Sequence, residues 1–139
     1  MNLTIPKPIY DEMVRHCIDE MPNEACGFLG GKVGEASALY PLANAALSPV
    51  YYRPEGKQML AAFNDMEEQG LELVAIFHSH VASPAYPSVT DVREAHYPVA
   101  YVIVSLSDEN SPVCRAFEVI KSDWRDEAGE ILEVDVVLS

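Results

Sequence analysis

The stretch LELVAIFHSHVASPAYPSVTD, residues 71–91, decides the expected fold because a strand, a loop and a helix start follow one another within it. Its central apolar run is typical of an interior strand. The order SVTD matches a helix-capping box, with Ser88 at the N-cap and Asp91 three residues later. We therefore expect a strand over residues 71–79 and a short helix from Ser88 to about Ala95.

The two histidines of this stretch, His78 and His80, lie two residues apart at the end of the expected strand. In an extended strand such residues project from the same face, about 6 to 7 Å apart. Val74 and Ile76 have the same parity, so we expect them to form an apolar floor behind the two imidazole rings. A histidine pair at a strand end is more often simply polar, and by itself it predicts no metal site.

Asp91 is a third candidate ligand for the same ion, because the loop after His80 is long enough to fold back over the strand end. Two histidines and one carboxylate are a usual ligand set for zinc, and three protein ligands leave one tetrahedral position for water. Helix capping alone also explains the spacing of Ser88 and Asp91. The two interpretations are compatible, since a serine at a helix start can hold its hydroxyl close to the ion.

A hydrolytic metal site also needs a group that takes a proton from water and returns it to the leaving amine. Beyond the candidate ligands, residues 77–91 contain no such group. Glu72 has the strand parity of His78, but six residues of strand would separate the two by about 20 Å. Spacing alone does not choose among the remaining acids of the chain.

The rest of the chain predicts two longer helices and several strands. Apolar residues recur at helical spacing over residues 8–20 and 55–69. Further strands are expected over residues 25–31, 37–45, 48–54, 99–107, 113–121 and 131–139. This order favours a single α+β (mixed α/β) domain, residues 1–139, with helices packed on a mostly β core.

The composition excludes some partners. The formal net charge is -13, from 9 basic and 22 acidic residues, which disfavours nucleic acid and anionic membrane surfaces as partners. The longest apolar run is about six residues, far short of the roughly 20 that span a membrane. The first twenty residues do not resemble a secretory signal, so we expect a cytoplasmic protein. The three cysteines lack metal-site spacing and are expected to be reduced and mostly buried.

The residues HSHVASPAYPSVTD fit, position for position, the signature of the JAMM metallopeptidases, also called MPN-plus domains: His-x-His, seven residues, Ser, two residues, Asp. The family also has a glutamate between its first helix and first strand, and NEACGFLGG supplies Glu24 there. The chain resembles this family from the first helix to about Ser107. The resemblance implies a JAMM/MPN-type single domain with a central mixed β-sheet flanked by helices.

The same resemblance implies zinc-dependent hydrolysis of an amide or isopeptide bond without a covalent intermediate. Carried over onto this chain, His78, His80 and Asp91 are the zinc ligands. Glu24 is the general acid and base that activates the attacking water and protonates the departing nitrogen. Ser88 is the hydrogen-bond donor to the oxyanion. Without the resemblance, a glutamate among 22 acidic residues is more simply a solvated charge.

The segments EACG, NAALSPVYYR and AYPSVTDV are similar to the small bacterial members of the family, the CysO-cysteine peptidase subgroup. That resemblance implies a ubiquitin-like sulfur carrier ending in Gly-Gly as the partner, and release of cysteine from a carrier-cysteine adduct. Tyr52 and Arg53 are candidate substrate-binding residues, because a guanidinium suits the carboxylate of a cysteine-ended substrate. A strand-edge aromatic beside a surface arginine explains the pair more simply.

Two alternatives remain open. The same chemistry could act on another ubiquitin-like conjugate or on a general peptide. A non-catalytic MPN-type scaffold would keep the fold without the reaction, although such scaffolds typically lack parts of the metal motif. The oligomeric state is unknown from the sequence.

Overall fold

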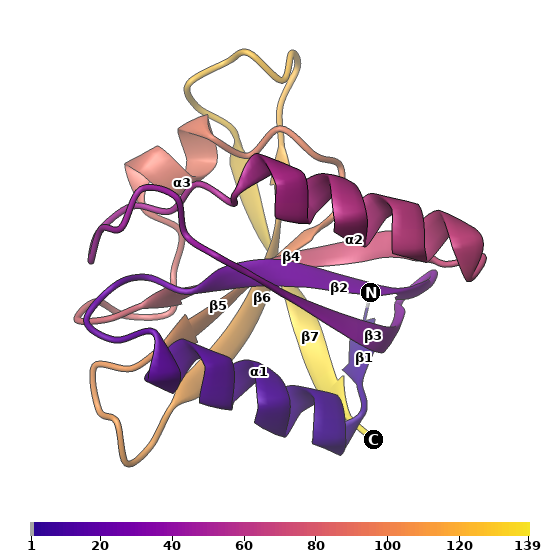
Figure 1. Cartoon of the computed structure of the whole chain (residues 1–139). Helices are drawn as coiled ribbons and strands as arrows, with labels where there is room; N and C mark the ends of the chain where they lie inside the picture. Colours follow the sequence, from indigo (N-terminus) through magenta and orange to yellow (C-terminus); the bar gives the residue numbers. More distant parts are fainter. Residues whose placement is uncertain (1) are drawn as a thin grey trace.

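The computed structural model describes residues 2–139. Seven strands form one closed barrel in the spatial order β1-β3-β2-β4-β5-β6-β7, and three helices lie outside it (Figure 1). The strands are β1 (Asn2–Ile5), β2 (Cys26–Lys32), β3 (Glu35–Leu42), β4 (Glu72–His80), β5 (Ala100–Ser105), β6 (Val113–Ile120) and β7 (Glu130–Leu138). The helices are α1 (Lys7–Asp19), α2 (Gly56–Glu68) and α3 (Val89–Arg93).

The closed barrel corrects the expectation of a central sheet flanked by helices, while the mixture of helices and strands is as expected. The difference comes from β1, a strand that the sequence pattern did not predict. β1 pairs in parallel with β7 along its whole length and bridges β3 through Thr4 and Glu35. These pairings join the two ends of the sheet, so the strands close on themselves.

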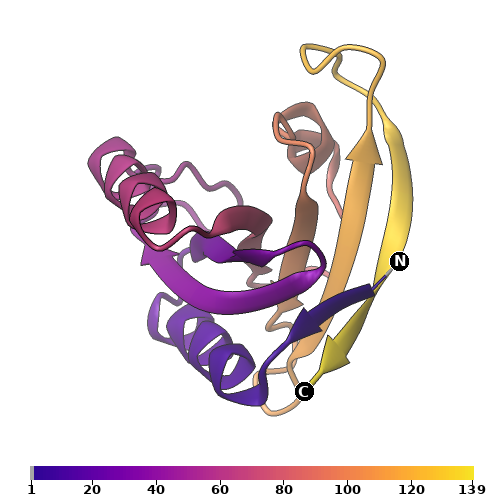
Figure 2. The same cartoon turned by 90° about the vertical axis from the view of Figure 1, so that its right-hand side faces the viewer.

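The two longer helices lie on opposite sides of the β2–β3 hairpin (Figure 2). Both begin and end within one residue of the predicted bounds. α2 begins where the Glu55 carboxylate accepts a hydrogen bond from the backbone amide of Gln58, at 2.7 Å. α3 is shorter than expected, because it ends at Arg93 rather than near Ala95.

The strand expected over residues 48–54 is wrong. In that segment only Pro54 makes a ladder contact, as an isolated bridge to Asn44. Two of its residues are prolines, which have no backbone N–H to donate to a neighbouring strand. The backbone groups of Tyr51 and Arg53 bind the side chain of Asn44 instead of a strand.

A bulge in β4 separates the two predicted members of the apolar floor. Ala75 pairs with Leu29 and Leu73 with Gly30, so Val74 is an extra residue in the ladder. Val74 therefore packs in the cluster that contains buried side chains of α1, whereas Ile76 packs in the cluster beneath α2. The floor behind the histidines consists of Ile76 together with Cys26 and Phe28 of β2, all of them buried.

The close packing of β2 on β4 depends on a glycine. A Cβ atom at Gly27 would overlap the ring of Phe77 and the backbone carbonyl of Tyr40. Gly27 pairs with Phe77, which lies between Ile76 and His78 in β4. The absence of a side chain at Gly27 therefore allows β2 to approach the strand that carries the two histidines.

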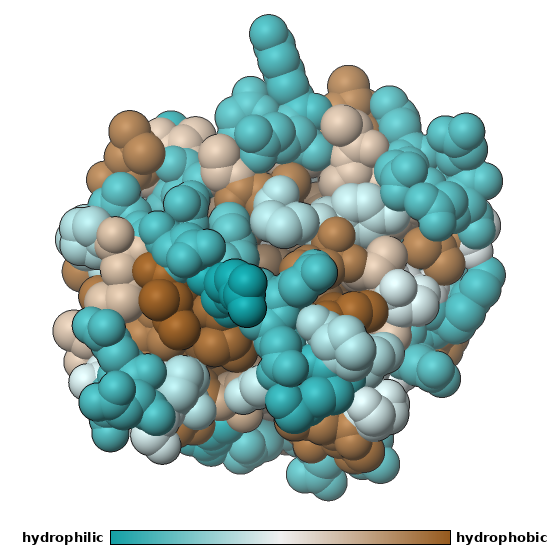
Figure 3. Space-filling view, turned by 60° about the horizontal axis from the view of Figure 1, so that its bottom comes forward, coloured by the Kyte–Doolittle hydropathy of each residue, from teal (hydrophilic) through white to brown (hydrophobic). Residues whose placement is uncertain are grey.

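The outer surface is mixed in character. On the face shown in Figure 3, hydrophobic patches are each bordered by hydrophilic residues, so this side offers no continuous apolar area. Within residues 2–139, no helix is both long and apolar enough to cross a membrane. The cysteines are free, with Cys17 and Cys26 buried and Cys114 half-buried, as predicted.

Candidate metal centre

Strand β4 presents two buried imidazoles at its C-terminal end. β4 pairs with β2 on one side and with β5 on the other, so its backbone is held from both edges. His78 is fully buried and His80 is 4% exposed. Their Nε2 atoms lie 3.1 Å apart, which confirms that the two rings project from the same face of the strand.

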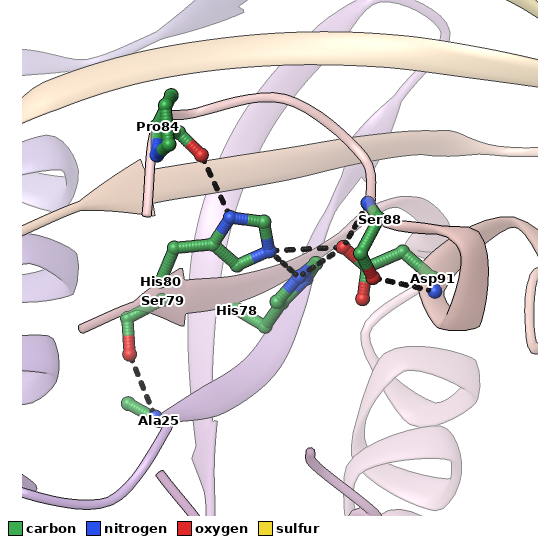
Figure 4. Close-up of polar contacts among 7 residues, drawn as sticks. All are labelled: Ala25, His78, Ser79, His80, Pro84, Ser88 and Asp91. Atoms are coloured by element: carbon green, nitrogen blue, oxygen red, sulfur yellow. Dashed lines mark hydrogen bonds and ion pairs between the residues drawn. The ribbon is translucent and has the colours of Figure 1, made fainter. Parts of the chain in front are cut away.

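The start of α3 brings a carboxylate to the same point. The Ser88 hydroxyl accepts a hydrogen bond from the backbone amide of Asp91 at 3.0 Å, and the Ser88 amide donates to Asp91 Oδ2 at 2.9 Å. This is the predicted capping box. It fixes the Asp91 side chain so that Oδ2 also lies 2.9 Å from His80 Nε2 and 3.3 Å from His78 Nε2 (Figure 4).

The three ligand atoms fit a divalent ion such as zinc. Ligands about 2.0 to 2.1 Å from a tetrahedral zinc lie roughly 3.3 Å from one another, and the separations here are 2.9 to 3.3 Å. Two imidazole nitrogens that face each other and one carboxylate oxygen also form a donor set that zinc prefers. His78, His80 and Asp91 form a group of possible metal ligands within the described residues.

The charges of the triad suit a cation. Burial alone would raise the pKa of Asp91, but its hydrogen bonds with both histidines hold that pKa well below its usual range. Burial alone would lower the pKa of His80, but the Asp91 carboxylate and the carbonyl of Pro84 raise it. The aspartate is therefore ionised over the whole physiological range of pH, which favours a positive partner.

The outer contacts orient His80 for metal binding. His80 Nδ1 lies 2.8 Å from the carbonyl oxygen of Pro84 (Figure 4). A carbonyl can only accept, so Nδ1 carries a hydrogen, and the neutral ring would offer the lone pair of Nε2 to an ion. His78 is held differently: the ring of Tyr52 stacks on it at a centroid distance of 4.5 Å and an angle of 19°.

Glu24 lies just before β2, and the charges of His80 and Asp91 affect its pKa. It is 5% exposed, and its Oε1 has no hydrogen-bond partner within residues 2–139. Burial raises the pKa of Glu24 to about 8; His80 lowers it somewhat and the Asp91 carboxylate raises it further. A buried carboxyl group with a pKa near neutrality has the properties of a general acid and base.

Ser79 fixes this glutamate relative to the histidines. The Ser79 hydroxyl accepts a hydrogen bond from the amide of Ala25 at 2.8 Å (Figure 4). The Ser79 amide also donates to the carbonyl of Ala25 at 3.0 Å. Ser79 stands between the two histidines, on the opposite face of β4. The sequence pattern did not single it out, although a buried serine inside an apolar strand was a usable signal.

Tyr52 and Arg53 line a cavity of about 230 Å³ beside the triad. Its other lining residues are mostly aromatic or apolar and include Phe28, Ile76 and Tyr101. Burial raises the pKa of Tyr52 well above its usual value, so its hydroxyl stays protonated. The exposed Arg53 makes no ion pair with another of the described residues.

Comparison with known proteins places these features in a family. The family model described as prokaryotic homologs of the JAB domain matches residues 6–120. The chain is 35% identical to the CysO-cysteine peptidase of Mycobacterium tuberculosis over 134 residues, which covers 94% of this chain and 92% of that protein. It is 37% identical to the probable TtuB-protein conjugate cleaving protease of Thermus thermophilus over 102 residues, which covers 73% of this chain and 68% of that protein.

Two solved structures share the fold. A protein from Desulfitobacterium hafniense is similar with a TM-score of 0.86 and 34% sequence identity, covering 99% of this chain and 92% of that one. A JAB1/MPN domain protein from Archaeoglobus fulgidus is similar with a TM-score of 0.57 and 18% identity, covering 97% and 99%. The second likeness concerns the fold alone.

Proposed function

The chain belongs to the family of prokaryotic homologs of the JAB domain, and we propose that it is a zinc-dependent peptidase that cleaves an amide bond at the C-terminus of a ubiquitin-like sulfur-carrier protein. The observation that carries the proposal is the pairing of two buried histidines and a half-buried aspartate with a buried glutamate whose pKa is raised. If these residues only stabilised the fold, there would be no reason to bury the Glu24 carboxyl group without a hydrogen-bond partner beside three positioned ligands.

His78, His80 and Asp91 would hold the ion. A zinc ion there would polarise the scissile carbonyl and a water molecule and would lower the pKa of nearby acids. Glu24 then accepts a proton from the attacking water and passes it to the departing nitrogen as the C–N bond breaks. The products are a carboxylate on the carrier and a free amine.

Ser88 would stabilise the charge that develops on the carbonyl oxygen. Its Oγ accepts from the Asp91 amide through a lone pair, so its own hydroxyl hydrogen is left to donate. A fixed donor aimed at a developing oxyanion is commonly worth about 3 to 4 kcal/mol. The capping box therefore supports two functions at once, since it positions one ligand and one hydrogen-bond donor.

The substrate part of the proposal rests on the relatives. The similarity to a CysO-cysteine peptidase covers almost the whole chain, which supports a carrier-cysteine adduct as the substrate. Arg53, exposed at the cavity beside the triad, is suited to bind the carboxylate of the terminal cysteine. Tyr52 would form the wall between that carboxylate and His78.

A second candidate is an isopeptidase for other ubiquitin-like conjugates. It is supported by the similarity to a TtuB-protein conjugate cleaving protease, although that similarity covers less of both chains. A non-catalytic scaffold is disfavoured, because the ligand set and the glutamate are all in place.

Mass spectrometry of defined substrates tests the proposal. A ubiquitin-like carrier ending in Gly-Gly-Cys and the same carrier joined to a lysine side chain are incubated separately with the zinc-loaded protein. We expect the first to lose the mass of cysteine, and we expect a chelator to stop the reaction. Cleavage of the lysine conjugate alone would favour the second candidate, and cleavage of neither would refute the peptidase proposal.

A further inference from the structure

Asn44, in the segment between β3 and α2, uses the full hydrogen-bonding capacity of its side chain inside the protein. Its Nδ2 donates to the carbonyls of Glu24 at 3.0 Å and Tyr51 at 2.9 Å. Its Oδ1 accepts from the amides of Ala46 at 2.9 Å and Arg53 at 3.0 Å. A carboxamide has two donor hydrogens and two acceptor lone pairs, and Asn44 is only 4% exposed.

These partners belong to both halves of the candidate site. Tyr51 and Arg53 flank Tyr52, so one side chain holds the backbone on each side of the residue whose ring stacks on His78. The same side chain holds the carbonyl of Glu24. No other side chain among residues 2–139 makes hydrogen bonds to both of these segments.

The loop that Asn44 organises also holds Glu24 a second time. The amide of Glu24 donates to the carbonyl of Ser48 at 2.9 Å. Ser48 lies between Ala46 and Tyr51, within the turn that Asn44 closes from inside. Both backbone groups of Glu24 are therefore bound to this loop, while the neighbouring Ala25 is bound to β4 through Ser79.

We infer that Asn44 is a positioning residue that couples Glu24 to the cavity wall formed by Tyr52 and Arg53. Its catalytic meaning rests on the proposed peptidase function. The coupling has a chemical requirement that few side chains meet, because residue 44 must donate twice and accept twice. Aspartate has the same shape and keeps the acceptor, but it lacks the donors that bind Glu24 and Tyr51.

The substitutions Asn44→Asp and Asn44→Ala separate the two halves of the role. We expect Asn44→Asp to lower kcat by about 100-fold, as for a displacement of about 1 Å at a reacting group, with a smaller change in KM. Asn44→Ala should lower kcat similarly and also raise KM, because the amide of Arg53 loses its acceptor. The assay measures release of cysteine from the carrier-cysteine adduct.

The matched control is Gln58→Ala. Gln58 Oε1 accepts from the amide of Ala43 at 2.6 Å, so the control removes one hydrogen bond from the adjacent residue without touching the site. We expect its kcat and KM to stay within about threefold of the unsubstituted protein. Zinc stoichiometry and the absorption spectrum of the cobalt-substituted protein should be unchanged in all three variants, since Asn44 contacts none of the candidate ligands.

Hydrogen–deuterium exchange tests the coupling without any activity. Asn44→Ala should speed exchange of the amides of Glu24, Ala46 and Arg53 together, and Gln58→Ala should not. The inference is overturned if both Asn44 variants keep normal kinetics, if exchange changes in only one segment, or if both variants lose cooperative unfolding and zinc. If the unsubstituted protein cleaves nothing, the proposed function fails and the exchange result alone decides the coupling.

Discussion

The metal-free protein should lose stability as the pH rises toward 8, because of the single carboxyl group of Glu24. Its pKa is about 8 in the folded protein and 4.5 in an ordinary glutamate, and burial is the main cause. A carboxyl group whose pKa is raised by folding stabilises the folded state below the unfolded pKa. That contribution is lost as the pH rises through the folded pKa, since the unfolded chain ionises first.

The size of the effect follows from the linkage relation. Between about pH 6 and pH 8 the Glu24 carboxyl is ionised in the unfolded chain and largely protonated in the folded one, so stability falls by about 1.4 kcal/mol per pH unit. Because the folded carboxyl group is itself half ionised at pH 8, the full loss over this range would be about 2 kcal/mol. Residual solvation of the carboxyl group reduces the expected loss to about 1 to 2 kcal/mol.

Urea unfolding of chelator-treated protein at the two pH values measures this loss. Glu24→Gln keeps the shape of the side chain and removes its ionisation, so the other titrating groups, including His80 and Asp91, are common to both proteins. The unsubstituted protein should weaken relative to Glu24→Gln between the lower and the higher pH, so the difference in unfolding free energy between the two proteins should grow by about 1 to 2 kcal/mol over this range. An unchanged difference in unfolding free energy between the two pH values would refute the reasoning about Glu24.

The remaining predictions concern the ligands, the helix cap and the strand packing. Asp91→Ala should abolish zinc binding, measured by metal analysis, whereas the unsubstituted protein should bind one zinc per triad; a variant that retains a full equivalent would exclude Asp91 as a ligand. Ser88→Ala should lower kcat by about 100-fold, and Ser88→Asp should restore the cap without restoring kcat; an active Ser88→Asp variant would exclude the hydroxyl as donor. Gly27→Ala should reduce the unfolding free energy by about 1 to 3 kcal/mol, because the added Cβ overlaps Phe77 and the carbonyl of Tyr40; an unchanged urea midpoint would contradict that packing.

The parts of the site that sequence could predict are those fixed by local geometry. Strand parity was enough to place His78 and His80 on one face, since the bulge in β4 lies before them. The capping box was enough to place Ser88 and Asp91 at one helix start. Each of these relations joins residues within a single element, where backbone geometry leaves few alternatives.

The parts that sequence could not predict depend on contacts between distant segments. The barrel closes through β1, a strand of four residues that carries too little pattern to be recognised. Val74 does not lie behind the histidines as predicted, because β4 has one residue more than β2 at the bulge. Asn44 lies in an irregular segment, and its partners come from both sides of it in the chain. Glu24 was named only through the family resemblance, because no local pattern distinguishes it from the other acids.

The central claim is that Glu24 performs proton transfer beside an ion held by His78, His80 and Asp91. The most direct measurement is the rate of cysteine release from a carrier-cysteine adduct by zinc-loaded Glu24→Gln, with the zinc content of the same sample determined in parallel. We predict a full equivalent of zinc and a rate lower than that of the unsubstituted protein by a factor of about 100 to 10,000. A zinc-loaded variant that releases cysteine at the unsubstituted rate would contradict the claim.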